Sequence, residues 1–477
     1  MEKIKKTIYF KKIVFSLLFL VIISSSLFFL SYFLIKSKIK EDIKNKKKYH
    51  IVLNTKYGHA DEGFSEQAVV GVCNAFKISN KNCRGGHELF KDNTIGYGFP
   101  YTMEDPFLIR NYIDNFIKND QANNFVLPGF TFNEFLCQFN QKYEKKQINL
   151  ISIGTSFYLK NKNCNYLAEN KWPKNLWQIN FKEYYAGYHA ALYSAVYALL
   201  HPEKFKDYNW SKKGKQIAFA ALGGLWIPPI ISYVLGFKYG IQKVNEIRQK
   251  FLKYQKNKII DTELLFVKYQ NIGGFSVSKM GDKVKAMSKN IYKNNKVSVI
   301  MNIAVSLSSS VHLAALESNE ETNKKQHWVI GVDVDQGHIL FKEPKDEPKI
   351  KNQILVSGIL RIKKAVTEVI KNKISKQKIP KGPFIPGKSE TENKHSEYST
   401  IPDRFKKNKE VWNKIIDNNL ENLNTLKNGL LVSKFDCLII STMQSPSISK
   451  ELKQFLNNSN SKIDEKDLLW KKMTKKC

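Results

Sequence analysis

From residue 49 onward, short apolar runs alternate with longer stretches in which apolar residues recur at helical spacing. The apolar runs predict buried strands at His50–Asn54, Asn124–Leu127, Asn149–Ile153, Gln216–Ala221, Leu264–Val267, Val297–Ala304 and Trp328–Val332. The periodic stretches predict helices at Phe64–Phe76, Tyr184–Leu200, Pro229–Val244 and Asp282–Tyr292. This alternation is typical of βα units and parallel sheets. Because 477 residues exceed what one core holds, we expect an α/β fold of two doubly wound lobes.

The predicted fold already indicates where a ligand binds. Open parallel sheets bind ligands outside the carboxyl ends of their strands. Two such sheets that face one another form a cleft between the lobes. Several predicted strands run into Gly, Asn, Asp or Ser, which places short polar groups at this edge. Within the second predicted helix, Gly187, Ala190, Ala191 and Ser194 form a stripe of small residues that favours close helix packing.

The two ends of the chain and one internal segment depart from the βα pattern. Ile13 to Ile35 carries no charged residue and exceeds the roughly 20 residues that span a bilayer. We expect residues 1–48 to be a signal anchor and a lysine-rich tether, with no lipid-attachment cysteine because the first cysteine is Cys73. Residues 371–400 are rich in Pro, Gly and charge and predict a flexible insertion. Beyond it we expect a helix at 403–431, a strand at 434–441 and a fraying tail from Asn457.

The formal charge of +34 changes this picture less than its size implies. Of 77 basic residues only five are arginines, whose planar fork suits phosphates and bases best. The excess of Lys, Asn and Ile is typical of an AT-rich genome. We therefore do not predict nucleic acid as a partner. A lysine-rich binder of nucleic acid or heparin remains an alternative, and it would show a steep salt dependence.

The chain carries no recognisable catalytic or metal-binding sequence pattern. The six cysteines and nine histidines are scattered, without CxxC or HExxH spacing, so no metal site and no cofactor are predicted. Some cysteines pair if the chain is exported, and the spacing does not say which. No GxSxG or Walker motif is present, and the sequence does not indicate an enzyme.

Seven segments carry short polar or glycine-bearing motifs at the predicted strand ends and helix starts. Each motif alone is common, and their order along the chain gives them specificity. They are Gly58–Gln67 (GHADEGFSEQ), Leu127–Phe135 (LPGFTFNEF), Phe181–Ala191, Gly223–Gly240, Gly273–Phe275 (GGF), Gly331–Gln336 (GVDVDQ) and Val356–Ala365.

In this order and spacing, the segments resemble the basic membrane protein family, the purine-nucleoside receptors of ABC importers. The resemblance runs from about residue 50 to residue 370. It implies the type I periplasmic binding protein fold, in which two lobes close on a ligand. It also implies a permease in the membrane as the partner and a nucleoside as the ligand.

The resemblance assigns roles to particular residues. Phe64 and Phe275 match the two aromatic residues that sandwich the base, and such stacking contributes about 1–3 kcal/mol per base. Asp333 and Asp335 match the acidic loop that accepts hydrogen bonds from the ribose hydroxyls. Further matches to ligand-contacting positions are Asp61, Ser65 and Glu134.

The sequence departs from the family pattern at one position that bears on the ligand. Leu360 stands where the family has a lysine that holds the ribose, with Arg361 beside it as the possible substitute. Losing a charge-assisted hydrogen bond costs about 1.5–3 kcal/mol. Either Arg361 contacts the ligand, or the ligand is not an ordinary nucleoside, or binding has been lost.

We therefore expect a membrane-anchored, extracellular solute receptor. Lobe 1 is predicted at 49–212 and 340–385, and lobe 2 at 213–339 and 400–477. The main alternative is a surface adhesin or antigen with the same fold and a degenerate pocket. An enzyme on the same two-lobed fold is a more distant alternative.

Overall fold

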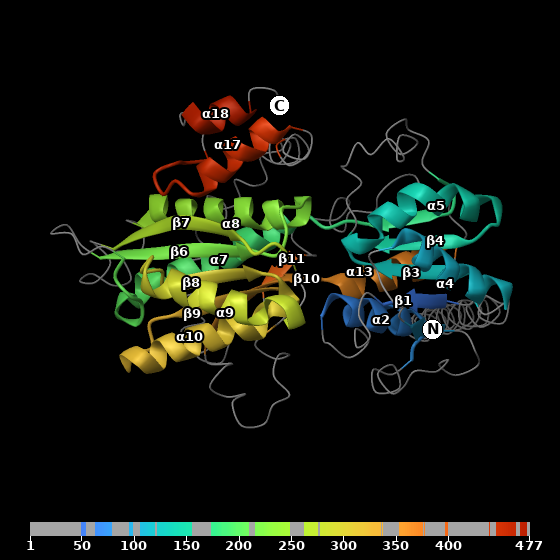
Figure 1. Ribbon diagram of the computed structural model, residues 1–477, viewed down its shortest axis with the longest axis horizontal. Coiled ribbons are helices and arrows are strands. Elements are labelled where there is room, and N and C mark those ends of the chain that lie inside the picture. The colour runs from blue at the N-terminus through green and yellow to red at the C-terminus, as the bar shows by residue number, and fades with distance from the viewer. Residues whose placement is uncertain are drawn as a thin grey trace, which may run out of the picture.

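In this computed structural model, the described residues are 49–53, 63–78, 95–98, 105–119, 122–154, 173–208, 215–248, 262–274, 277–334, 336, 353–374, 376, 396–398, 438, 445–463 and 468–474. They form two α/β lobes that lie side by side along the long axis of the molecule (Figure 1). Each lobe has one predominantly parallel sheet with helices on both faces. The expected two-lobed α/β architecture is therefore confirmed.

Lobe 1 is built on a five-stranded sheet in the order β2-β1-β3-β4-β5. Its strands are β1 (Tyr49–Val52), β2 (Ile95–Gly98), β3 (Asn124–Pro128), β4 (Asn149–Ile153) and β5 (Leu176–Ile179), and all are parallel. Along β3, Phe125 and Leu127 face one core and Val126 the other, because successive side chains point to opposite faces. Helices α4 (Pro106–Lys118) and α5 (Asn133–Lys145) cover one face, and α2 (Phe64–Ala75) and α13 (Ile362–Val369) cover the other.

Lobe 2 is built on a six-stranded sheet in the order β11-β10-β9-β8-β6-β7. Its strands are β6 (Gln216–Gly223), β7 (Glu263–Asn271), β8 (Val299–Ile303), β9 (Trp328–Asp333), β10 (Ile354–Leu360) and β11 (Ser396–Tyr398). All are parallel except β11, which pairs antiparallel with β10. Helices α7 (Glu183–Leu200) and α8 (Pro228–Ile247) cover one face, and α9 (Val277–Lys293) and α10 (Ser308–Thr322) cover the other. The C-terminal helices α17 (Pro446–Leu456) and α18 (Leu468–Thr474) pack outside α8 and β7 (Figure 1).

Helices α7 and α8 approach one another to backbone contact. A Cβ atom on Gly187 would lie 2.2 Å from the carbonyl oxygen of Tyr233, and one on Gly236 would lie 2.0 Å from that of Tyr184. The predicted small-residue stripe is thereby confirmed as a close-packing surface. Its consequence for the site is that the first turns of α7 and α8, including Tyr233, are held by main-chain contacts.

The lobe boundaries differ from those expected. Helix α7, predicted in lobe 1, packs against α8 and the lobe 2 strands, and β10 pairs with β9 in the lobe 2 sheet. The chain crosses from lobe 1 to lobe 2 after β5, returns after β10 to form α13, and crosses again before β11. The expected bounds placed residues 354–360 in lobe 1, whereas β10 lies in register beside β9 in the lobe 2 sheet.

The remaining sequence expectations have mixed outcomes. All seven predicted strands and all four predicted helices are present, each within a few residues of its expected bounds. Strands β2, β5 and β10 were not predicted as strands. The tail does not simply fray, since Trp470 and Met473 on α18 are buried. Residues 371–400 contribute buried Ile374 and strand β11, so the insertion is partly built into the fold.

Several predictions lie outside the described residues. The expected anchor at residues 1–48 and the expected helix at 403–431 are among them, and of the expected strand at 434–441 only Leu438 is described. Among the helices formed by described residues, none has the length and apolar character needed to cross a bilayer.

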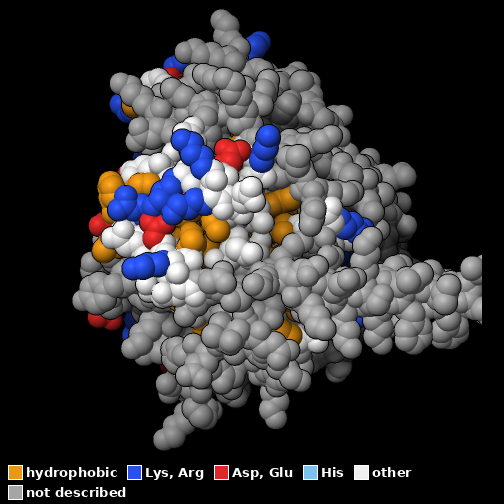
Figure 2. Space-filling view, turned by 90° about the vertical axis from the view of Figure 1, so that its right-hand side faces the viewer, with side chains coloured by type: hydrophobic (Ala, Val, Ile, Leu, Met, Phe, Trp, Pro, Cys, Tyr) orange, Lys and Arg blue, Asp and Glu red, His pale blue; other side chains and the backbone are white. Residues whose placement is uncertain are grey.

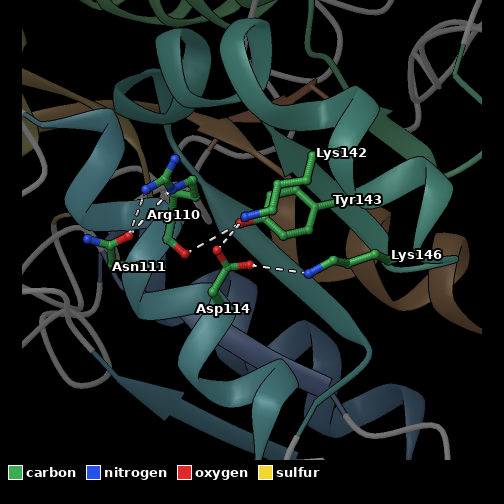
Figure 3. A network of polar contacts seen from close by, with 6 residues as sticks. All are labelled: Arg110, Asn111, Asp114, Lys142, Tyr143 and Lys146. Atoms are coloured by element: carbon green, nitrogen blue, oxygen red, sulfur yellow. Dashed lines mark hydrogen bonds and ion pairs between the residues drawn. The ribbon is translucent and has the colours of Figure 1, made fainter.

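The outer face of lobe 1 carries mixed charges rather than a uniform basic surface. Asp114 on α4 accepts contacts from Lys142 and Lys146, and the Tyr143 hydroxyl donates to the Arg110 carbonyl (Figure 3). Figure 2 shows lysine and arginine side chains gathered at this end of the molecule, interspersed with acidic and apolar ones. The described part of this face therefore lacks the continuous basic track that nucleic-acid backbones favour.

Candidate ligand-binding cleft

A cavity of about 540 Å³ lies between the lobes, where the carboxyl ends of both sheets meet. Its volume is in the range typical of small-molecule sites. Lobe 1 lines it with Gly63, Phe64, Ser65, Gly129, Phe130, Thr131 and Gly154. Lobe 2 lines it with Glu183, Ile227, Pro229, Ile230, Tyr233, Ile303, Ala304, Val305, Ser306, Ser309, Asp333 and Leu360. The cavity is thus where an open parallel sheet is expected to bind its ligand.

Phe64 is the aromatic residue that lobe 1 places at the cavity. It is the first residue of α2 and is only partly buried. Its ring lies against Gly154 at the end of β4, where an added Cβ would come within 2.6 Å of the ring Cζ atom. Gly154 has φ +67°, a conformation that favours glycine. The absence of a side chain at Gly154 therefore gives the Phe64 ring the space it occupies.

Asp333 is the carboxylate that lobe 2 places at the cavity. It ends β9 with φ +66°, a left-handed conformation that is uncommon for residues other than glycine. Strained conformations of this kind concentrate at functional sites. One carboxylate oxygen, Oδ1, accepts a hydrogen bond of 2.7 Å from the Tyr233 hydroxyl. The other oxygen of the same carboxylate is available for a second set of interactions.

The Asp333–Tyr233 pair has unusual protonation chemistry. Burial raises the pKa of Asp333 to about 6, while the hydrogen bond from Tyr233 opposes this rise. The pKa of Tyr233 lies well above its usual value because of burial and the nearby carboxylates of Asp333 and Glu183. Tyr233 consequently keeps its proton at neutral pH and remains a hydrogen-bond donor to Asp333.

Helix N-termini lie around the cavity. Lining residues lie at or near the first turns of α2, α5, α7, α8 and α10, which follow the strand ends around the cavity. The N-terminus of a helix carries a partial positive charge and unpaired N–H groups. None of the described lining residues is Lys, Arg or His, so these helix ends supply the positive partial charge at the cavity.

One lining hydroxyl has no hydrogen-bond partner. The Oγ1 atom of Thr131, which follows β3 in lobe 1, is buried and unpaired among the described residues. An unsatisfied buried polar atom costs free energy, typically about 1–3 kcal/mol. A ligand with a polar edge that reached Thr131 would remove this cost.

The structure brings together some of the predicted site residues and separates others. Phe64, Ser65 and Asp333 line the cavity. Glu134 does not, because it is exposed on the first turn of α5 and accepts a hydrogen bond from Gln138. Asp61, Phe275 and Asp335 lie outside the described residues.

Arg361 stands beside the cavity, not in its lining. It precedes α13 as the N-cap residue, while its neighbour Leu360 is buried against the cavity. Partial burial lowers the pKa of the Arg361 guanidinium. Leu360, at the position where the family has a lysine, therefore presents an apolar side chain to this cleft.

Four residues at the cavity were not predicted from the sequence: Tyr233, Glu183, Gly154 and Thr131. Glu183 directly precedes the predicted helix Tyr184–Leu200, and Tyr233 lies in the second turn of the predicted helix Pro229–Val244. Gly154 directly follows the predicted strand Asn149–Ile153, but its role depends on the ring of Phe64. Thr131 lay within a motif that was singled out for Glu134 instead.

Two further observations concern metal binding and disulfides among the described residues. No group of three or more His, Cys, Asp or Glu side chains in the described residues is arranged to hold a metal ion. Cys73 and Cys137 are each disulfide-bonded, and the described residues do not include the partner of either. Disulfides persist mainly in oxidising, extracytoplasmic compartments.

Two facing doubly wound lobes, linked by crossing segments and enclosing a cavity at their strand ends, form a fold that solved structures share. An ABC transporter solute-binding protein from Aeropyrum pernix K1 aligns with a TM-score of 0.51 at 17% identity, over 86% of this chain and 98% of its own. An ABC transporter solute-binding protein from Conexibacter woesei aligns less closely, with a TM-score of 0.46 at 11% identity over 74% of this chain and 88% of its own.

A family match agrees with the resemblance that the sequence motifs indicated. Residues 263–390 match the Bmp family, described as ABC transporter substrate-binding protein PnrA-like. The match includes β7 to β10, and therefore Asp333 and Leu360. No curated protein matches the chain. Residues 263–390 are thus similar to substrate-binding proteins of ABC transporters.

Proposed function

We propose that this protein is a membrane-anchored, extracellular receptor that binds a nucleoside, preferably a purine nucleoside, and delivers it to an ABC permease. The observation that carries the proposal is the pairing of Phe64 from lobe 1 with Asp333 from lobe 2 across one cavity. A nucleoside has a flat base to stack on the ring and two vicinal hydroxyls to donate to the carboxylate. The match of residues 263–390 to a family of ABC transporter substrate-binding proteins supports the role of a receptor.

The lining residues suit the two halves of a nucleoside differently. Ile227, Ile230 and Leu360 provide apolar surface for the base. Asp333 retains lone pairs beyond the one used by Tyr233, and hydrogen bonds from hydroxyls to a carboxylate are strong and directional. Thr131 offers an unpaired hydroxyl to a polar edge of the base.

The charges around the cavity favour a neutral ligand over a phosphorylated one. Asp333 and Glu183 are its two acidic lining residues, and none of the described lining residues is basic. A phosphate close to these carboxylates would be repelled, because like charges in a partly desolvated site interact strongly. The proposal is accordingly a nucleoside rather than a nucleotide.

The location and the partner are part of the same proposal. The uncharged stretch from Ile13 to Ile35 would anchor the chain, and the disulfides of Cys73 and Cys137 suit an extracytoplasmic body. Closure of the two lobes on the ligand would bring their outer surfaces into the arrangement that a permease recognises.

The test uses the full-length chain in detergent, unfolded and refolded to remove any ligand carried through purification. Calorimetric titration would compare adenosine, guanosine, cytidine, free adenine, ribose and AMP. We expect the purine nucleosides to bind most tightly, and AMP, adenine and ribose to bind much more weakly.

A matched pair of variants locates the binding event. Phe64→Ala removes the stacking surface and should weaken adenosine binding roughly 5- to 150-fold, equivalent to about 1–3 kcal/mol. Phe107→Ala is the control, because Phe107 is 52% exposed and lies on α4, away from the cavity. Equal losses in both variants, or tight binding of AMP, would contradict the proposed site.

Leu360 favours a second candidate function. It replaces a cation of the family site with buried apolar surface, as expected for a surface antigen that keeps the fold after losing its ligand. If the refolded chain shows a cooperative thermal transition but binds no member of the panel, this second function replaces the first.

A further inference from the structure

The segment between β6 and α8, together with the first turn of α8, forms one wall of the cavity. Ile227 of the segment and Pro229 and Ile230 of the helix line the cavity from this side. The start of the segment is held by main-chain hydrogen bonds, since the Gly273 N–H donates to the Gly224 carbonyl at 2.9 Å. Between Gly224 and the first turn of α8, the chain must be positioned by other contacts.

Trp226 supplies such contacts, and they come from the C-terminal part of the chain. Its Nε1 donates a hydrogen bond of 2.8 Å to Ser449 Oγ on α17. The Lys453 Nζ atom, one turn further along α17, lies 4.9 Å from the centre of the indole ring. The indole also packs against Tyr269 of β7, with ring centroids 5.2 Å apart. The residue directly before Ile227 is thus clamped between β7 and α17.

Helix α17 is itself firmly attached to lobe 2 (Figure 1). Buried Lys238 of α8 donates from Nζ to the carbonyls of Phe455, at 3.3 Å, and Asn458, at 2.9 Å. These carbonyls lie at the C-terminus of the helix, where acceptors lack intrahelical partners and a cation is favourable. The Tyr269 N–H also donates to Asn457 Oδ1 at 3.0 Å. The apolar face of α17 is buried, including Leu452 and Phe455.

We infer that α17 is a positioning element of the ligand cavity, with Trp226 as the positioning residue through which it acts. Ser449 and Lys453 fix the indole, and the indole fixes the segment that presents Ile227 to the ligand. The inference rests on the proposed ligand-binding function, but it concerns a helix that lies beyond residue 390, where the family match ends.

The physical consequence is preorganisation. A loop that is already ordered before binding avoids part of the entropy loss that association otherwise incurs. Without the Ser449 hydrogen bond, the segment from 225 to 227 would sample more conformations in the ligand-free protein. The loss should therefore appear in local dynamics first and in affinity second, with little change in global stability.

The first test needs no ligand. Amide hydrogen exchange of the full-length, ligand-free chain would follow the peptide that spans residues 224–231. Ser449→Ala and Trp226→Phe should each raise exchange in this peptide about tenfold, and the double variant should add nothing further. Ser447→Ala, an exposed serine on the same helix, is the matched control and should leave exchange unchanged. Unchanged exchange in Ser449→Ala, or a uniform rise throughout lobe 2, would overturn the inference.

The second test measures affinity, with adenosine as the probe. Removing one neutral hydrogen bond should raise the adenosine dissociation constant about threefold to tenfold in Ser449→Ala, with the melting temperature nearly unchanged. An affinity equal to that of the wild type would count against a role at the cavity. If the wild-type chain binds no nucleoside, the proposed function fails, while the exchange experiment still decides whether α17 positions the loop.

Discussion

Lobe 1 and lobe 2 share a doubly wound architecture but contribute different chemistry to the cavity between them. Lobe 1 offers an aromatic ring, Phe64, held in place by a glycine, together with an unpaired hydroxyl on Thr131. Lobe 2 offers a carboxylate, Asp333, which accepts a hydrogen bond from Tyr233. Tyr233 lies on α8, which packs closely against α7. Shape recognition of a base would therefore depend on lobe 1, and polar recognition of a sugar on lobe 2.

The difference extends to how each lobe orders its side of the cavity. In lobe 1 the positions depend on side-chain packing, as between Phe64 and Gly154. In lobe 2 they depend on main-chain contacts between α7 and α8 and on the C-terminal helix α17. Polar recognition requires accurately placed groups. Lobe 2, whose side of the cavity is supported by more contacts, carries the Asp333 carboxylate.

The largest expected effect comes from neutralising the lobe 2 carboxylate. Asp333→Asn keeps the shape of the side chain but removes the charge that would accept two ribose hydroxyls in the proposed complex. Two charge-assisted hydrogen bonds of about 1.5–3 kcal/mol each predict a loss of adenosine affinity of at least about 100-fold, measured by calorimetry. Asp282→Asn, at an exposed position on α9, is the control. A loss no larger than that of Phe64→Ala would contradict the assignment of polar recognition to lobe 2.

The next effect is a dependence on pH with opposite signs for affinity and stability. Because burial raises the pKa of Asp333 from 3.8 to about 6, folding takes up a proton between about pH 4 and pH 6. The stability contributed by this group is present below pH 4 and is lost as the pH rises through 6. Ligand binding needs the ionised form, so affinity should fall about tenfold from pH 7.5 to pH 5.

The measurements are adenosine titrations and ligand-free denaturant unfolding over the same pH range. In Asp333→Asn both curves should lose their slope between pH 4 and pH 6, because the titrating group is gone. Persistence of the slope in this variant would assign it to another group.

A smaller effect is expected from filling the space beneath the lobe 1 ring. Gly154→Ala would place a methyl group against Phe64 and strain a backbone with φ +67°, so adenosine affinity should fall about fivefold. The loss should disappear in a Phe64→Leu background if it acts through the ring, which a double-mutant cycle measures. An equal loss in both backgrounds would indicate a general distortion of the β4 terminus.

The smallest effect concerns the lobe 1 hydroxyl. Thr131→Val replaces the unpaired Oγ1 with a methyl group of similar size, and should weaken adenosine binding about threefold. Comparing the loss of affinity for adenosine, guanosine and cytidine would show which edge of the base reaches Thr131. Binding that improves for every nucleoside would show that the hydroxyl stays unpaired in the complex.

The sequence predicted the fold better than it predicted the site. Buried strands such as Gln216–Gly223 are continuous apolar runs, and their pattern alone identifies them. Strand β2, Ile95–Gly98, contains two glycines and resembles a loop, yet it is buried beside β1. Such a strand is specified by its neighbour in the sheet rather than by its own propensity.

In the site too, residues within local sequence motifs could be predicted, whereas residues positioned by tertiary packing could not. Phe64 and Asp333 lie in motifs that are readable along the chain. Tyr233 of α8 contacts Asp333 at the end of β9 across a separation of 100 residues, a contact that only tertiary packing creates. Glu134 was predicted near the ligand from its place in a motif, but helix α5 turns it toward solvent. The direction of a side chain on a helix depends on packing that a single sequence does not reveal.

The repeated crossing of the chain between the lobes bears on the order in which the molecule can be made. Lobe 1 lacks one of its covering helices until residues 362–369 of α13 have been synthesised. In lobe 2, β11 forms one edge of the sheet. Helix α17 covers β7, the strand at the opposite edge. Neither lobe can therefore complete its layers while the chain is short. A polypeptide emerging N-terminus first therefore completes its two lobes only as its last quarter arrives.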